Sequence, residues 1–558
     1  MSAGADKSIK TGADVVVRTL ETQGVKYVFG VPGAKIDTVF NGLVDSSIQT
    51  VVCRHEQNAA FIAGGIGRMT GKAGVAIATS GPGVSNLVTG LATANSEGDP
   101  IVALGGAVAH KDALKHIHQT MDSVSLLKPV TKSSVAVGAP HAVAEAMINA
   151  FRIAERGRPG AAFVSLPMDV MTASTGTPLL APPIASGPGP ASSGALAAAA
   201  KLISEAENPV VLLGLLASKP ANADATNRFV DHCKLAVVGT FQAAGAIGAH
   251  LWANFGGRVG QLANQPGDRL LDSADLLITI GYDPVEYWPE EWNKGKARKI
   301  VHIDVEPAAL DVDYCPTVEL TGDIAETLRS LSPIVIRSQL ATTSAGLLKT
   351  ISDERDSLAK ASEARNGSPI HPLRLAAEIQ KVLQPDVTLC LDMGSFHLWI
   401  ARYVHSFRAR QILISNGQQT LGVALPWAIA ASLVRPSEKV ISISGDGGFL
   451  FSGMELETAV RLGVHVVHMI WIDGYYDMVL QQEILKYGRG SGCDLGPYDP
   501  VKYAEAFGAT GMMIRTADEI APTLARAMDA SGPVIIGVPV DYSDNPKLFE
   551  MVSPNAFH

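Results

Sequence analysis

Several features that mark other classes of protein are scarce or missing in this chain. The five cysteines stand far apart and none forms a CxxC pair, which excludes a disulfide framework and a cysteine-based zinc site. The net charge is −9, so nucleic-acid binding has no electrostatic support. No apolar run reaches the roughly 18 residues of a membrane helix. The longest candidate, 421–434, is shorter and contains Pro426.

The first residues also lack the apolar core of a secretion signal. Asp6 and Asp14 argue against an Arg-rich transit peptide. The scattered cysteines are interpreted as reduced thiols. Together these features predict a cytoplasmic protein.

What the chain does contain is typical of a large α/β enzyme. Hydrophobic residues make up 47%, aromatic residues only 6%, and there are 54 glycines, as expected for buried parallel strands. The 558 residues exceed what one hydrophobic core accommodates. At roughly 100–200 residues per domain, three or more domains are expected.

Two segments poor in core-forming residues divide the chain. The predicted linkers are 181–196, within a stretch rich in Pro, Ser, Gly and Ala, and the polar, charged helical segment 338–369. The remaining parts, 1–180, 197–337 and 370–558, each alternate apolar strands with helical patterns. The strands are YVFGV, VVCRH, GVAIAT and IVALGG, then PVVLLG, LAVVGT, LLITIG and IVHIDV, then VTLCLD, KVISISG, VVHMIWI and PVIIGVPV. This pattern predicts three parallel-sheet α/β domains.

The most informative stretch follows the apolar strand 440–444. Gly445-Asp446-Gly447-Gly448 comes directly after that strand, and 25 residues separate Gly447 from Asp473, which ends a second apolar run. Ligands bind beyond the carboxyl ends of such strands, where glycines and a helix N-terminus can meet a phosphate. Two carboxylates there can hold a hard divalent cation. GDGG alone could simply close a turn, but the second acid favours a Mg²⁺-diphosphate site.

This motif resembles the diphosphate motif of the thiamine diphosphate (ThDP)-dependent enzymes. That family commonly ends the motif with Asn-Asn, whereas this chain has Asp473-Gly474, in which Asp supplies the same oxygen with an added charge. The resemblance implies three metal ligands: Asp446, Asp473 and the main-chain oxygen of Tyr475. It also implies the pyruvate oxidase/decarboxylase type of fold, with three parallel-sheet α/β domains.

Glu56 follows the predicted strand 50–53 and begins a helical pattern. By itself it reads as an acidic residue stabilised at a helix N-terminus. The resemblance implies a different role, because the family places a glutamate here whose carboxyl group hydrogen-bonds pyrimidine N1′ of ThDP and activates the cofactor. The surrounding segments 29–37 and 80–100 are similar to the family's first domain.

The resemblance assigns roles to further residues, each of which alone would be read as a surface or core residue. Gln119 would orient substrate or stabilise developing oxygen charge. Lys35 would steer a 2-oxo acid, and Leu421 would act as the wedge beneath the cofactor. Gln482 stands where biosynthetic acetohydroxyacid synthases carry a Trp. The other cofactor-binding candidates are Gly394, Ser395, His397, Gln419, Gly445, Asp446, Gly447, Gly448, Tyr476 and Met478.

Longer runs narrow the resemblance to the catabolic, FAD-independent acetolactate synthases. They include GADVVVRTLETQGVKYVFGVPGAKID and SNGQQTLGVALPWAIAA, and the similarity extends over about 12–542. The implied reaction condenses two pyruvates to 2-acetolactate with release of CO₂ through a hydroxyethyl-ThDP intermediate. Gln482 offers less apolar surface than Trp, so pyruvate is the expected acceptor. A homodimer or homotetramer with its active site at the subunit interface is also implied.

The resemblance to FAD-independent enzymes implies that FAD is not bound, and 197–337 contains no G-x-G-x-x-G fingerprint. Three alternatives remain open at this point: another ThDP-dependent 2-oxo acid decarboxylase, an oxidase, or a non-catalytic metabolite-binding relative. The joint presence of Glu56, Asp446 and Asp473 argues against the last, because a chain without activity has no reason to keep all three.

Overall fold

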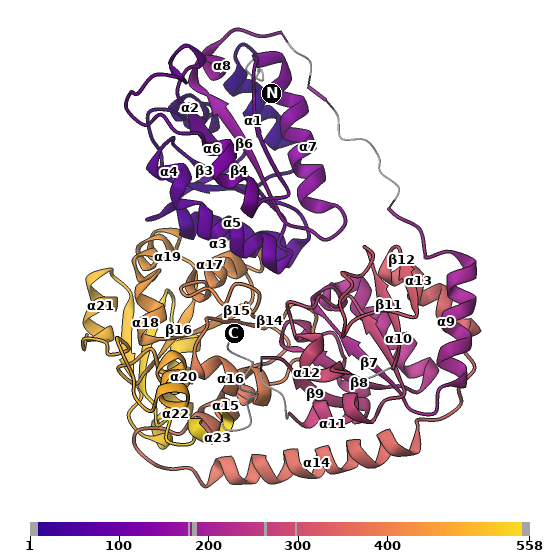
Figure 1. The fold of residues 1–558 in the computed structure, drawn as a ribbon. Coiled ribbons are helices and arrows are strands. Elements are labelled where there is room, and N and C mark those ends of the chain that lie inside the picture. The colour runs from indigo at the N-terminus through magenta and orange to yellow at the C-terminus, as the bar shows by residue number, and fades with distance from the viewer. Residues whose placement is uncertain (1–8, 177–178, 181–186, 262–264, 296–297, 550–558) are drawn as a thin grey trace, which may run out of the picture. The chain divides into compact units, whose positions relative to one another are not determined.

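The computed structural model describes residues 9–176, 179–180, 187–261, 265–295 and 298–549 (Figure 1). These residues contain three six-stranded sheets in which all neighbouring strands are parallel. The predicted fold class is therefore confirmed. Contacts divide the chain into two compact units. The first holds the described residues before Ser186 together with Ile429–Pro436 and Ser452–Val464, and the second holds the rest.

The first sheet has the strand order β2-β1-β3-β4-β6-β5. Its central strands are buried on both faces, as parallel sheets covered by helices require. The capping box of Thr11 and Asp14 starts the first helix. The elements are α1 (Gly12–Thr22), β1 (Tyr27–Gly30), α2 (Asp37–Val44), β2 (Gln49–Val52), α3 (Glu56–Thr70), β3 (Gly74–Ala78), α4 (Pro82–Asn86), α5 (Val88–Glu97), β4 (Ile101–Ala107), α6 (Ser123–Leu127), β5 (Ser133–Ala136), α7 (Val143–Glu155), β6 (Ala161–Pro167) and α8 (Met168–Thr172).

The middle sheet has the order β12-β11-β10-β7-β8-β9, which is the arrangement of a dinucleotide-binding fold. Its elements are α9 (Ser193–Glu205), β7 (Pro209–Leu213), α10 (Pro220–Cys233), β8 (Ala236–Thr240), β9 (Phe255–Val259), α11 (Pro266–Ser273), β10 (Leu276–Ile280), α12 (Pro289–Asn293), β11 (Lys299–Asp304), β12 (Val318–Thr321), α13 (Ile324–Leu331) and α14 (Thr342–Glu363).

The third sheet, β14-β13-β15-β16-β18-β17, repeats the strand order of the first sheet. Its elements are α15 (Pro372–Val382), β13 (Val387–Leu391), α16 (Ser395–Tyr403), β14 (Ile412–Leu413), α17 (Ala424–Val434), β15 (Lys439–Gly445), α18 (Asp446–Leu450), α19 (Leu456–Leu462), β16 (Val467–Ile472), α20 (Asp477–Tyr487), α21 (Pro500–Ala506), β17 (Thr510–Met513), α22 (Ala517–Asp529), β18 (Val534–Pro539) and α23 (Asn545–Phe549).

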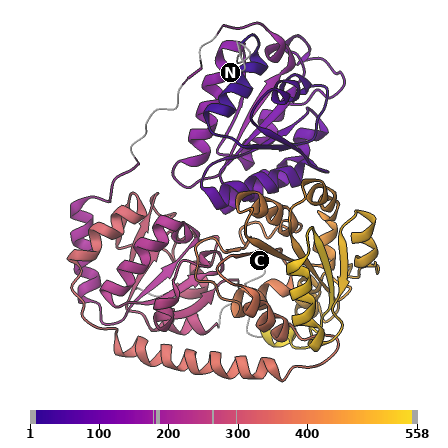
Figure 2. The same ribbon diagram turned by 180° about the vertical axis from the view of Figure 1, so that it is seen from behind.

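The predicted linkers contain structure of their own. Within 338–369 lies α14, a helix of 22 residues that lies against α11 and α15 (Figures 1 and 2). Leu348 and Ile351, one turn apart, are buried in the apolar cluster of the middle domain. The helix therefore packs although most of its surface is polar. Residues 181–186 of the other predicted linker lie outside the described residues, and α9 begins at Ser193.

The middle sheet reverses its strand order between β7 and β10, where an open α/β sheet has its binding crevice. Two turns approach each other closely at this point, because a Cβ on Gly214 would lie 2.3 Å from the carbonyl oxygen of Gly281. The buried carboxylate of Glu286 accepts the N–H of Leu215 (3.0 and 2.9 Å) and the hydroxyl of Thr240 (2.6 Å). The Glu286 carboxylate thus binds the backbone amide of Leu215, a kind of group that binds phosphate in nucleotide-binding folds.

None of the described helices combines the length and the apolar character that a membrane-spanning helix needs.

Candidate active site

Glu56 is placed by the turn between β2 and α3. His55 caps the helix, since its Nδ1 accepts the N–H of Gln57 at 3.1 Å, and Glu56 is the first helical residue. The Glu56 carboxylate is buried and accepts a hydrogen bond from Asn86 Nδ2 at 2.9 Å. A Cβ on Gly83 would lie 3.3 Å from Glu56 Oε1. A glycine at this position therefore leaves one carboxylate oxygen open to a ligand.

Gln119 lies beside the same glycine turn. Its backbone has a φ of 64°, and its Oε1 accepts the hydroxyl of Ser80 at 3.3 Å. A Cβ on Gly81 would come within 3.2 Å of the Gln119 side chain, and Gly81 itself has a φ of 66°. Lys35 follows β1, and its main-chain N–H donates to Thr79 Oγ1 at 3.4 Å. The structure thus brings Glu56, Gln119 and Lys35 to the carboxyl ends of β1, β2 and β3.

A buried glutamate that the sequence analysis missed supports the Glu56 turn. Glu455 Oε1 accepts the main-chain N–H groups of Arg54 (2.8 Å) and His55 (3.1 Å) and the side-chain amide of Asn58 (3.2 Å). Its Oε2 accepts the hydroxyl of Thr458 at 2.7 Å. Burial raises the pKa of the Glu455 carboxyl above its ordinary value, and these hydrogen bonds lower it. The residue thus holds the backbone just before Glu56 and the side chain of Asn58 just after it. The role of Glu455 is visible only from its contacts with residues about 400 positions away in the sequence, because its own segment has an ordinary helical pattern.

The two carboxylates of the predicted metal site meet at the ends of β15 and β16. Asp446 is the first residue of α18, and its carboxylate accepts the N–H groups of Gly447 (3.0 Å) and Gly474 (2.9 Å). The hydrogen bond from Gly474 joins Asp446 to the loop that starts at Asp473. The ring of Tyr476 packs on Gly447, where a Cβ would lie 2.5 Å from Tyr476 Cε1. Only a glycine fits at this position.

The electrostatics of this site favour a cation. Burial, followed by the charges of Asp446 and Asp477, raises the pKa of Asp473 to about 8. Burial also raises the pKa of Asp446. Among the described residues no group of three or more His, Cys, Asp and Glu side chains could hold a metal. The predicted set, two carboxylates and the main-chain oxygen of Tyr475, leaves positions for phosphate oxygens and water. These donors fit Mg²⁺, which keeps several such ligands.

The predicted wedge, Leu421, is held beside the GDGG turn. Buried Asp392, at the end of β13, accepts the N–H of Gly422 with both oxygens at 2.9 Å, and burial raises its pKa to about 7. A Cβ on Gly448 would lie 3.7 Å from Leu421 Cδ2 and 3.2 Å from Asp392 Oδ2. Leu421 and Gly448 are therefore close neighbours. Gln419 is exposed and has a φ of 48°.

The remaining candidates on α16 and α20 divide into two groups. Gly394 caps α16, and Ser395 donates to Asp477 at 2.5 Å, which joins the starts of both helices. Met478 and Gln482 are half-buried and lie one turn apart on α20. His397 lies elsewhere: it is completely buried, edge-on to Phe241 at 5.6 Å, and burial lowers its pKa to about 3. It packs on the middle domain and is not gathered with the Asp446 group.

Comparisons with known proteins identify the family of this chain. The N-terminal TPP-binding, central and C-terminal TPP-binding domain models of thiamine pyrophosphate enzymes match residues 10–126, 196–331 and 392–538. Catabolic acetolactate synthase of Raoultella terrigena is 54% identical over 538 residues, 96% of either chain. Acetolactate synthase of Bacillus subtilis (strain 168) is 47% identical over 98% of this chain and 96% of its own. The large subunit of acetolactate synthase isozyme 2 of Escherichia coli K12 is 29% identical over 98% of each. The chain belongs to the acetolactate synthase family of thiamine diphosphate-dependent enzymes.

Proposed function

We propose that this protein is a ThDP- and Mg²⁺-dependent acetolactate synthase that condenses two pyruvates to 2-acetolactate and CO₂. One observation carries the proposal: the Glu56 carboxylate is buried, held by Asn86 and left open by Gly83. The chain that carries this glutamate is 54% identical, over 96% of its length, to a relative named catabolic acetolactate synthase. A carboxyl group so placed is what activation of the cofactor's pyrimidine requires.

The chain's own residues bind and orient the reactants. Asp446, Asp473 and the main-chain oxygen of Tyr475 would hold Mg²⁺ and through it the diphosphate. Glu56 would hold a proton at pyrimidine N1′, and Leu421 would support the bent cofactor. When bound, ThDP supplies a carbanion and accepts the electron pair released with CO₂.

The acceptor is proposed to be a second pyruvate. Lys35 would attract its carboxylate, and the Gln119 amide would orient its keto oxygen. Gln482, half-buried on α20, presents little apolar surface for the extra methylene of 2-oxobutyrate. A methylene in a pocket contributes about 1–3 kcal/mol, so the preference for pyruvate is expected to be partial.

We propose that the reaction proceeds without FAD. The close approach of the Gly214 and Gly281 backbones at this point of the middle sheet supports this, as does the hydrogen bond from the Leu215 amide to Glu286. The proposed assembly is a homodimer or homotetramer with its active site at the subunit interface. The five free cysteines support the proposed cytoplasmic location.

The test is an assay of the purified protein with ThDP, Mg²⁺ and pyruvate, with and without FAD. Acetolactate, measured as acetoin after acid treatment, and acetaldehyde are quantified together. Equal acetolactate formation with and without FAD is the expected result. Acetaldehyde alone would identify a decarboxylase, and a strict flavin requirement would identify an oxidase-like enzyme. Binding of ThDP with neither product would indicate a non-catalytic relative.

A further inference from the structure

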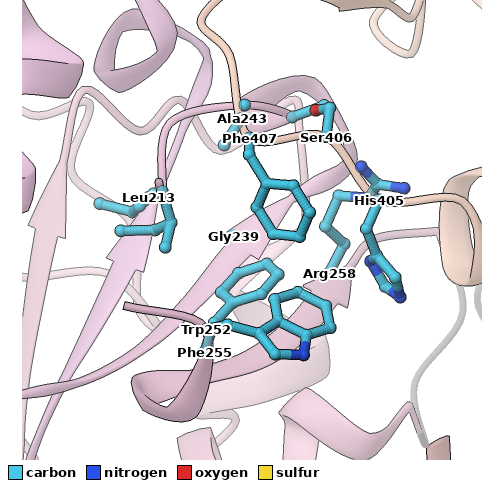
Figure 3. A pocket seen from close by; sticks show the side chains of 12 residues that line it. Leu213, Gly239, Ala243, Trp252, Phe255, Arg258, His405, Ser406 and Phe407 are labelled. Carbon is cyan, nitrogen blue, oxygen red and sulfur yellow. The ribbon is translucent and has the colours of Figure 1, made fainter. Parts of the chain in front are cut away.

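A small cavity lies inside the second unit, where the ends of β7 and β8 meet residues 405–407 (Figure 3). Its volume is about 10 Å³, room for one particle of the size of a water molecule. Figure 3 shows His405 beside the ring of Trp252, Arg258 next to them, and Ser406 above the ring of Phe407. None of the described residues that line the cavity is acidic.

The surroundings of the cavity carry positive charge, for which the described residues supply no carboxylate partner. Buried Arg258 donates to main-chain carbonyls at the end of α16, with its Nε 2.6 Å from the oxygen of Ala401. Burial lowers the Arg258 pKa to about 9. Arg355 lies over the Trp252 ring, with Cζ 4.2 Å from the centroid, and burial lowers its pKa to about 10. The charges of both arginines, added to burial, lower the pKa of His405.

Two polar atoms of the lining residues have no hydrogen-bond partner within the described part of the chain. They are Ser406 Oγ and His405 Nδ1, and both are buried. Buried polar atoms are nearly always satisfied, by protein, water or an ion. Both residues come from the segment after α16, whereas Arg258 comes from β9. A single occupant could therefore bind residues from the middle and C-terminal domains together.

We propose that this cavity binds one small monatomic anion, of which chloride is the common example. A water molecule could satisfy Ser406 and His405 but would not offset the charges of Arg258 and Arg355. A buried charge requires a compensating partner. Phosphate and carboxylate ligands are too large for a space of about 10 Å³. The bound anion would join the middle domain to residues 405–406. This inference does not depend on the proposed catalytic function.

Crystals of the holoenzyme grown in sodium bromide provide the direct test. An anomalous bromide peak is expected in the cavity, within hydrogen-bond distance of Ser406 and His405. Absence of a peak there, with a fully ordered water instead, would overturn the proposal.

Thermal unfolding in solution distinguishes a true site from an adventitious ion only. Chloride or bromide replaces gluconate at constant ionic strength, and Tm is expected to rise to a plateau. Ser406→Ala should raise the half-saturating halide concentration by about tenfold, since one hydrogen bond to a charged ligand is lost. The matched control is Thr226→Val, which removes a buried hydroxyl on α10 that also lacks a partner in the described residues but does not line the cavity.

The control should respond to halide as the wild type does. If all three proteins respond alike, the effect does not come from this cavity and the proposal fails. Bromide seen in crystals without a saturable effect on Tm would mean an adventitious ion only. An equal stabilisation by phosphate would also contradict the proposal, because phosphate does not fit the cavity.

Discussion

Replacing Glu455 by Gln tests how the turn that carries Glu56 is held. The substitution keeps the size of the side chain but removes the charge from the group that accepts hydrogen bonds from Arg54, His55 and Asn58 at 2.8, 3.1 and 3.2 Å. A hydrogen bond to a charged group contributes about 1 kcal/mol more than one between neutral groups. Three such bonds therefore lose about 2–3 kcal/mol. If the whole of this free-energy loss affects the placement of Glu56, activation of the cofactor becomes roughly 30- to 150-fold slower.

The assay is exchange of the C2 proton of bound ThDP for deuterium, which reports activation of the cofactor separately from carboligation. We expect Glu455→Gln to slow exchange and kcat together, with ThDP affinity nearly unchanged. Glu457→Gln is the matched control: Glu457 lies two residues away but is partly exposed, in ion pairs with Arg54 (3.2 Å) and Arg461 (3.0 Å). Such surface pairs contribute about 0–1 kcal/mol, so this variant should behave nearly as the wild type.

A wild-type exchange rate in Glu455→Gln would refute the reasoning, because the turn would then be held by other contacts. A lower Tm with unchanged exchange would mean that Glu455 supports the fold but does not position Glu56.

Three further predictions concern the cofactor site. Glu56→Gln should leave ThDP binding intact but slow C2 exchange by about 10²- to 10⁴-fold, the usual contribution of a positioned acid or base. In metal-free protein the pKa of Asp473 is raised from 3.8 to about 8, so the folded state binds the extra proton and stability should fall as pH rises across this range. Addition of Mg²⁺ or the substitution Asp473→Asn should reduce this pH dependence of stability. The measurement is Tm as a function of pH. Gln482→Trp should shift the competition between 2-oxobutyrate and pyruvate toward 2-oxobutyrate by about tenfold, as product ratios would show; an unchanged ratio would place Gln482 outside the acceptor pocket.

Buried strands could be predicted from the sequence because their pattern is local. All twelve predicted strands are present, including the fully buried β3, β7 and β13. Six further strands were missed, and five of them, β5, β9, β12, β14 and β17, are edges of sheets. Edge strands need fewer apolar residues, and β14 has only two residues. The helix α14 lies in the segment predicted as a polar, helical linker, since few of its residues are apolar, and Leu348 and Ile351 suffice to pack it.

The amino-acid sequence by itself determined the family, the three-domain α/β fold and the spacing of Asp446 and Asp473, since these depend on residues near one another in the chain. Only the tertiary structure revealed the buried carboxylates that hold these elements. Glu455 lies 401 residues from its partner Arg54, and Asp392 lies 30 residues from Gly422. Glu286 accepts the main-chain N–H of Leu215, 71 residues away. An isolated acidic residue predicts a solvated surface position, and only the amides that folding brings to it make its burial favourable.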